Sequence, residues 1–124
     1  MIAADTSSLV AYFNGEAGAD VQRLVAAMTA GELALPPVVL MELLSDPVGA
    51  STIARQLDSL PHLDVSEGYW ARAGNTRRVL HSHGLKAKVG DALIAQSCID
   101  HNVALITRDR DFRHFAAHCG LKLA

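Results

Sequence analysis

The feature that most constrains the fold is the alternation of short apolar runs with longer segments of helical periodicity. Strand-like runs are expected at 1–4, 32–36, 62–66, 103–107 and 121–124. Helical segments are expected at 7–13, 18–31, 37–45, 48–60, 67–84, 88–102 and 110–120. Right-handed crossovers between parallel strands place helices on both faces of a sheet, so its strands read as continuous apolar runs. The alternation predicts an α/β fold, a three-layer α/β/α sandwich around a central parallel sheet of four to five strands.

The length and composition predict a single domain over residues 1–124. Half of the residues are hydrophobic, which is enough for a sizeable core, and a chain of this length has no room for a second domain of usual size. No apolar run reaches the ~18 to 20 residues that a membrane span needs. The first residues also lack the basic and then apolar segments of a secretory signal. We therefore expect a cytoplasmic protein with no membrane partner.

The charge balance limits how the chain can bind nucleic acid. Eleven basic and thirteen acidic residues give a formal net charge of −2. This is not the strongly basic balance of a protein that binds nucleic acid through its net charge. If nucleic acid is the partner, additional positive charge is needed where the two molecules meet, and bound divalent cations can supply it.

Acidic residues lie beside the expected carboxyl ends of the strands. Asp5 follows the first strand, Asp109 and Asp111 follow the run "ALIT", and Glu42 lies in the helix after the second strand. Asp91 is expected to open a helix that runs back toward the amino end of the next strand, so it also starts at the carboxyl edge. In open α/β sheets, ligands bind at this edge. The five carboxylates are therefore expected to converge on one pocket.

Two interpretations of these carboxylates remain open at this point. Aspartate is a common N-cap, and Asp5, Asp91 and either Asp109 or Asp111 each lie near the start of a predicted helix. Alternatively, the carboxylates bind hard divalent cations, which prefer oxygen ligands and relieve the repulsion between like charges. Two such ions roughly 3.5 to 4 Å apart can activate a water and stabilise the leaving oxygen in phosphodiester hydrolysis. The convergence of several carboxylates on one edge favours the metal site.

Four stretches, in this order, resemble the acidic motifs of PIN domains: "ADTSSLVAYF", "LMELLS", "VGDALIAQSC" and "ALITRDRDF". The resemblance covers the whole chain, and it is greatest to the VapC toxins of bacterial and archaeal toxin–antitoxin pairs. It implies a PIN-like fold and an endoribonuclease that depends on Mg²⁺ or Mn²⁺. It also implies a homodimer, and a VapB-like antitoxin that forms a complex with the toxin and blocks its site with a C-terminal segment.

The resemblance also implies roles for individual residues. The catalytic carboxylates would be Asp5, Glu42, Asp91 and Asp109. The metal would be held by Asp5, Asp91 and Asp109, with Glu42 and Asp111 as further candidate ligands. The supporting residues would be Thr6, Ser7, Thr107 and Asp111. Whether Asp109 or Asp111 ligates the metal directly is left open, because both follow the same strand.

Basic residues beside the acidic motifs are candidates for contacts with the phosphates of RNA. They are Lys86, Lys88, Arg108 and Arg110. The alternative is that these side chains are solvated surface charges.

Two other functions fit an acidic pocket. A structure-specific DNA nuclease could use the same carboxylates, although such a short chain has no room for an accessory DNA-binding region. A receiver-like signalling domain also carries acidic residues at strand ends. It normally has an acidic pair after its first strand, where this chain has Asp5 alone, and an acceptor after its third, where this chain has Asp64 inside the run "HLDVS".

Overall fold

The computed structural model describes residues 1–47 and 50–124, so the start of the helix expected at 48–60 lies outside the described residues. Within them, three parallel strands form a sheet in the order β2-β1-β3. The strands are β1 (Ile2–Ala4), β2 (Leu33–Ala34) and β3 (Ala104–Ile106). The parallel sheet confirms the predicted fold class.

The sheet is narrower than the predicted four to five strands. The segments expected as third and fifth strands each make a single parallel bridge, Leu35 with His62 and Leu105 with Leu123. In each segment one leucine is buried and its neighbours are exposed. Such a segment does not gain the two-sided burial that lengthens a central strand. The two segments therefore border the sheet without becoming strands.

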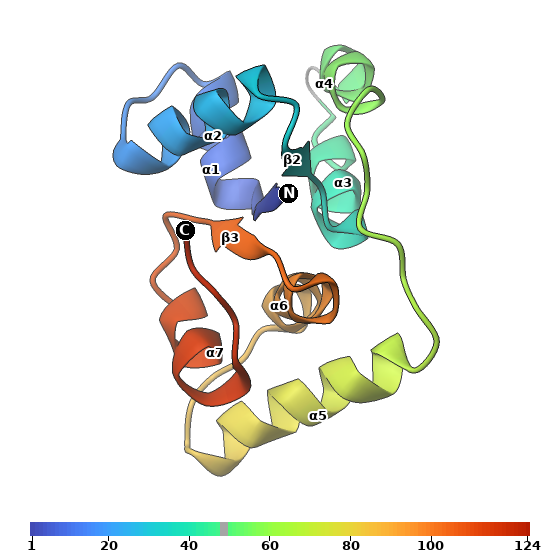
Figure 1. Cartoon of the computed structure of the whole chain (residues 1–124), viewed down its shortest axis with the longest axis vertical. Coiled ribbons are helices and arrows are strands. Elements are labelled where there is room, and N and C mark those ends of the chain that lie inside the picture. Colours follow the sequence, from blue (N-terminus) through green and yellow to red (C-terminus); the bar gives the residue numbers. More distant parts are fainter. Residues whose placement is uncertain (48–49) are drawn as a thin grey trace.

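Seven helices in the described part of the chain cover the sheet (Figure 1). They are α1 (Thr6–Phe13), α2 (Ala19–Thr29), α3 (Pro37–Leu44), α4 (Ala50–Leu57), α5 (Tyr69–Ser82), α6 (Val89–His101) and α7 (Phe112–Cys119). In Figure 1, α1 and α2 lie on one side of the strands and α5, α6 and α7 on the other, while α3 and α4 flank β2. None of the described helices is long and apolar enough to cross a membrane.

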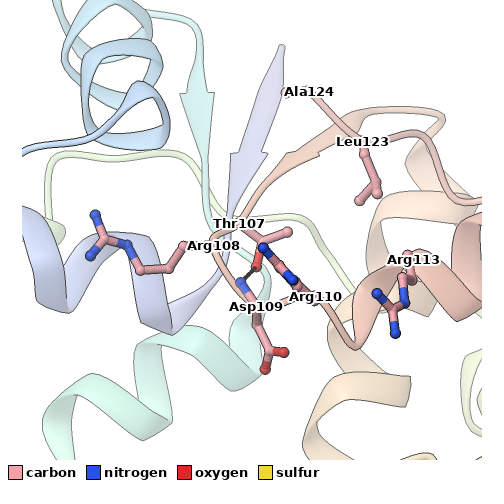
Figure 2. A pocket seen from close by; sticks show the side chains of 7 residues that line it. All are labelled: Thr107, Arg108, Asp109, Arg110, Arg113, Leu123 and Ala124. Atoms are coloured by element: carbon pink, nitrogen blue, oxygen red, sulfur yellow. Dashed lines mark hydrogen bonds between the residues drawn. The ribbon is translucent and has the colours of Figure 1, made fainter.

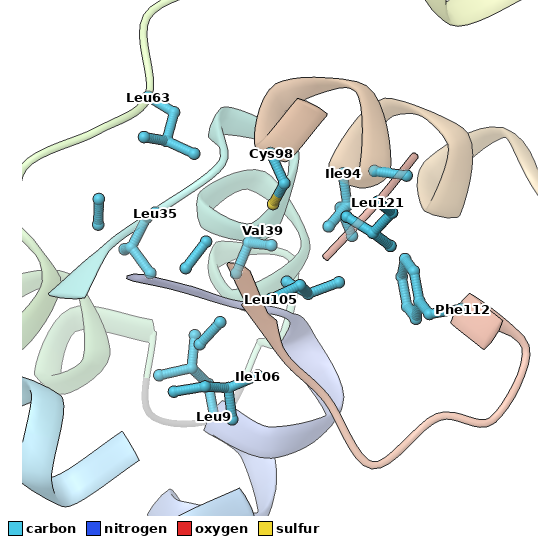
Figure 3. Packing of buried hydrophobic residues seen from close by; sticks show 14 of the residues in the cluster. Leu9, Leu35, Val39, Leu63, Ile94, Cys98, Leu105, Ile106, Phe112 and Leu121 are labelled. Atoms are coloured by element: carbon cyan, nitrogen blue, oxygen red, sulfur yellow. The ribbon is translucent and has the colours of Figure 1, made fainter. Parts of the chain in front are cut away.

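The hydrophobic core lies on both faces of the strands (Figure 3). Successive side chains of a strand point to opposite faces. In β3, Ile106 accordingly lies on the side of Leu9 from α1, whereas Leu105 lies on the side of Ile94 and Phe112 (Figure 3). All five side chains are at most 2% exposed. This packing holds the ends of β1 and β3 in place, and the acidic residues follow directly from those ends.

Candidate metal centre

Asp5 is the most buried of the predicted site carboxylates, with only 4% of its surface exposed. It follows β1 directly and is the N-cap of α1, where its Oδ1 accepts a hydrogen bond from the Ser8 backbone N–H at 3.3 Å. The Ser7 hydroxyl donates to the same oxygen at 2.7 Å, and the Thr107 hydroxyl donates to Oδ2 at 2.8 Å. Burial raises the pKa of Asp5, these hydrogen bonds oppose that effect, and Asp109 adds to it. Asp5 therefore caps a helix and also faces the site.

Asp91, Asp109 and Asp111 form the closest acidic cluster at the carboxyl edge. Each offers a carboxylate oxygen, and these oxygens lie within 4.8 Å of one another. Asp91 and Asp109 are partly buried, whereas Asp111 is exposed. Asp91 comes from the first turn of α6, and the other two come from the loop between β3 and α7. Helix α6 runs away from this edge and β3 runs back toward it, so the start of α6 lies beside the residues that follow β3.

Like charges in this cluster disfavour its fully ionised form. Burial raises the pKa of Asp91 to about 6, and the neighbouring carboxylates of Asp109, Asp5 and Asp111 contribute to the rise. The Lys88 ammonium offsets part of it. The effect of Asp5 on Asp91 also indicates that Asp5 belongs to the same electrostatic site, although it is not among the three closest carboxylates. A cation at this position would favour all of these carboxylates in their charged form.

Glu42 lies at the border of the site. It is exposed on α3, and its Oε1 accepts a hydrogen bond from the Thr6 hydroxyl at 3.1 Å. A Cβ atom added to Gly90 would stand 3.9 Å from the same oxygen, so Glu42 approaches the start of α6 one residue before Asp91. Glu42 therefore lies beside the cluster without being one of its three closest members.

The expected N-caps are only partly correct. Helix α6 begins at Val89 with Lys88 as its N-cap residue, so Asp91 is inside the first turn and does not cap the helix. Asp111 occupies the N-cap position of α7, but its side chain makes no capping hydrogen bond. Instead, Oδ1 of Asp109 accepts a hydrogen bond from the Asp111 backbone N–H at 2.9 Å. Of the candidate caps, the structure therefore confirms Asp5 alone, and the carboxylates of Asp91, Asp109 and Asp111 instead lie close to one another.

Thr107 connects the two ends of the site. Its hydroxyl donates to Asp5 and accepts from the Asp109 backbone N–H at 3.0 Å (Figure 2). Ser7 makes a similar link, because its hydroxyl donates to Asp5 and accepts from the Arg108 backbone N–H at 3.4 Å. The structure therefore places two of the three predicted supporting hydroxyls, those of Ser7 and Thr107, between the ends of β1 and β3, whereas the third, that of Thr6, donates to Glu42.

The candidate RNA contacts are not equivalent. Lys86 and Lys88 are exposed just before α6. Arg108 is instead held by Asp20, to which its Nε and Nη2 donate at 2.8 and 3.1 Å, and it lies 3.6 Å from Glu16. In Figure 2 its side chain points away from Arg110 and Arg113. A role for Arg108 in RNA binding stays a prediction, and it would have to coexist with this ion pair.

Sequence reasoning missed Asp20, which anchors the loop that carries Asp109. Besides Arg108, it accepts a hydrogen bond from the buried Ser8 hydroxyl at 2.8 Å. Gly18 permits this approach, since a Cβ there would lie 2.5 Å from Asp20 Oδ1 and its φ of +154° is one that other residues rarely adopt. No local motif marks Asp20, because its partner Arg108 is 88 residues away along the chain.

Asp20→Asn is expected to lower thermal stability at neutral pH and to change it little near pH 2. Hydrogen bonding to Arg108 lowers the pKa of Asp20 to about 2, compared with roughly 3.9 for an unfolded aspartate. A depressed folded pKa contributes stability that is present above the unfolded value and is lost as pH falls through about 2. Melting curves across this range test the prediction. Asp64→Asn, at an exposed position, is the control. The difference between its melting temperature and that of the wild type should not change with pH.

The donor set of the cluster fits a hard divalent cation. Its closest members offer only carboxylate oxygens, which Mg²⁺ and Mn²⁺ prefer over nitrogen or sulfur ligands. Their mutual repulsion, reflected in the raised pKa of Asp91, is the effect that a bound cation reverses. The carboxylates of Asp91, Asp109 and Asp111 lie closest together, and Asp5 and Glu42 adjoin them as further candidate ligands.

Solved structures that superpose on this chain include chains from two crystal structures. A chain in the crystal structure of VapBC2 from Rickettsia felis, bound to a DNA fragment from its promoter, superposes with a TM-score of 0.78 at 23% identity. That match covers 100% of this chain and 98% of the other. A chain in the crystal structure of FitAcB from Neisseria gonorrhoeae superposes with a TM-score of 0.72 at 18% identity, covering 99% and 96%. At these identities the matches show a shared fold. A search of curated proteins found no match.

The family comparison is more specific than the structural one. The model of the PIN domain family matches residues 2–118, which include every acidic residue of the candidate site. This match confirms the resemblance that the four sequence motifs indicated. The chain belongs to the PIN domain family.

Proposed function

We propose that this protein is a metal-dependent endoribonuclease toxin of the VapC type, which hydrolyses phosphodiester bonds of RNA. PIN domains are generally nucleases. The observation that carries the proposal is the meeting of Asp91, Asp109 and Asp111 within 4.8 Å at the carboxyl edge of a PIN fold. The two superposed structures, of VapBC2 and FitAcB, support the toxin assignment.

The carboxylates have different roles in the proposed reaction. Asp5, Asp91 and Asp109 would hold Mg²⁺ or Mn²⁺, with Asp111 as a further ligand, direct or through water. When bound, the metal supplies an activated water and stabilises charge on the leaving oxygen. Glu42 would bind metal or position the water. Thr107 and Ser7 orient the Asp5 carboxylate through the hydrogen bonds that they donate to it.

The proposal includes two protein partners. A cognate VapB-like antitoxin would form a complex with the toxin and block its site. A second copy of the chain would form a homodimer, and this is supported by the exposed apolar surface of Trp70 and Val89, which are 66% and 58% exposed and border a pocket of about 150 Å³. The exposure of Trp70 excludes its side chain from the core.

The decisive experiment compares RNA and DNA as substrates of the purified protein. We expect cleavage of RNA with Mg²⁺ or Mn²⁺, no cleavage with EDTA, and little cleavage of DNA of the same sequence. Cleavage of DNA alone would support the DNA nuclease alternative. RNA cleavage that is unaffected by EDTA would contradict the metal mechanism. Growth arrest on expression, relieved by co-expressing the neighbouring upstream gene, would test the toxin–antitoxin part separately.

A further inference from the structure

A pocket of about 340 Å³ opens beside the acidic cluster and shares Asp109 with it (Figure 2). Its walls come from the loop between β3 and α7, from the first turn of α7 and from the segment that ends at Ala124. Three arginines, Arg108, Arg110 and Arg113, line this pocket beside one acidic side chain, that of Asp109. Leu123, which is 42% exposed, adds an apolar wall. A basic pocket therefore adjoins an acidic centre in a chain of net charge −2.

Two of these three arginines are free to bind a ligand. Arg108 is committed to Asp20 and Glu16. The exposed side chains of Arg110 and Arg113 form no ion pair or hydrogen bond with any residue that the structure describes. The Arg113 backbone N–H donates to the Arg110 carbonyl at 3.1 Å, so the two residues are one turn apart. Both guanidinium groups thus belong to one short stretch of the pocket wall.

The opposite side of the site has a different character. A smaller pocket of about 90 Å³ borders Glu42 and is lined by apolar residues, including Val10 and Phe13, together with the acidic Glu42 and Asp46. Carboxylates there repel a phosphate, whereas the arginines beside Asp109 attract one. A polyanion that reaches the acidic cluster is therefore favoured on the Asp109 side and disfavoured on the Glu42 side.

We infer that the pocket beside Asp109 is a phosphate subsite, in which Arg110 and Arg113 bind a phosphodiester group of the RNA strand next to the scissile bond. Guanidinium groups match the oxygens of a phosphate in geometry and charge, and the apolar wall at Leu123 suits the ribose or base. Single-stranded nucleic acids are commonly bound by such a combination of positive charge and apolar surface. This inference rests on the proposed function and deepens it, because it assigns the side of the site along which the substrate strand runs.

Binding of RNA, measured apart from cleavage, tests the subsite. The probe is a fluorescein-labelled oligouridylate with phosphorothioate links, which keep the negative charge and resist hydrolysis, and the readout is fluorescence anisotropy with Mg²⁺ at several salt concentrations. Arg110→Ala and Arg113→Ala are each expected to weaken binding by about tenfold, the typical effect of losing one hydrogen-bonded charge. Each should also reduce the slope of log K against log salt by roughly 0.7, the value for one phosphate contact on a single strand.

Two matched variants make the outcome specific. Arg23→Ala removes an exposed arginine from the opposite, amino edge of the sheet, where Arg23 borders a pocket with Met1 and Ile2, and it should leave both affinity and slope unchanged. Arg113→Lys keeps the charge and should retain most of the salt slope. Equal binding by the wild type and both alanine variants, or no binding by the wild type, would overturn the subsite. Binding that depends on Arg110 and Arg113, without cleavage of ordinary RNA, would instead overturn the proposed function and leave the subsite standing.

Discussion

Asp5→Asn is expected to reduce RNA cleavage by at least about 100-fold while the protein stays folded. Residues that merely orient metal ligands typically contribute 10- to 100-fold to activity or metal affinity, so the loss of a ligand charge should cost no less. Asparagine is as good an N-cap as aspartate, and its carbonyl oxygen can still accept from the Ser8 backbone N–H as Asp5 does. The substitution therefore removes the charge and keeps the helix start. Initial rates of RNA cleavage with saturating Mg²⁺ are the measurement.

The matched control for this prediction is Asp58→Asn. Asp58 is an exposed aspartate just after α4 and outside the acidic cluster, so the control makes the same chemical change without touching the site and should cleave at the wild-type rate. A circular-dichroism melting curve separates a loss of chemistry from a loss of fold. A folded Asp5→Asn protein with near wild-type activity would exclude Asp5 from the catalytic set.

Asp91→Asn is expected to stabilise the metal-free protein and to abolish its stabilisation by Mg²⁺. Because the folded pKa of Asp91 is raised to about 6, the wild type loses stability as pH rises from roughly 3.9, the unfolded value, through about 6. That difference corresponds to about 3 kcal/mol at roughly 1.4 kcal/mol per pH unit. Solvent screening of the partly exposed carboxylate, and the loss of a negative charge near the start of α6, reduce the expected gain to about 1 kcal/mol at pH 7.5.

Adding Mg²⁺ should make the wild type more stable than the Asp91→Asn variant. A ligand that binds only the folded state at 100 times its Kd stabilises it by about 2.7 kcal/mol, and this gain requires the Asp91 carboxylate in the wild type. Thermal melts in EDTA and in increasing Mg²⁺, at pH 5 and 7.5, measure both effects. At pH 5 the metal-free difference between wild type and variant should shrink, because Asp91 is then largely protonated in the folded wild type. Equal stabilisation of the two proteins by Mg²⁺ would remove Asp91 from the metal centre.

The sequence alone predicted the class of fold because hydrophobic periodicity is a local property. Each helix found in the described residues overlaps a predicted segment, and β1, β2 and β3 coincide with predicted apolar runs. The predictions of a third and a fifth strand were wrong, because these two segments lie at the edges of the sheet and each makes a single bridge. Whether an extended segment at an edge becomes a strand depends on how much of it is buried, and burial is a property of the packed chain.

The acidic motifs were predictable for the same local reason, since a carboxylate that follows a parallel strand must lie at the carboxyl edge. The sequence could not show which of those carboxylates lie closest together or which is most buried. Only the folded chain brings the first turn of α6 beside the loop after β3, where Asp91 meets Asp109 and Asp111. It also brings the Thr107 hydroxyl to the buried Asp5 carboxylate, 102 residues away along the chain.

The stretch "TRDRDF" shows where local information ends. Its sequence by itself determined that two carboxylates and two arginines would follow β3 at the carboxyl edge. Only the tertiary structure decided their different surroundings: Arg108 is paired with Asp20 from α2, whereas Arg110 is left beside Arg113 at an open pocket. Opposite charges pair according to distance in space, and the distance between residues 88 positions apart is set by the folded chain and not by the order of its residues.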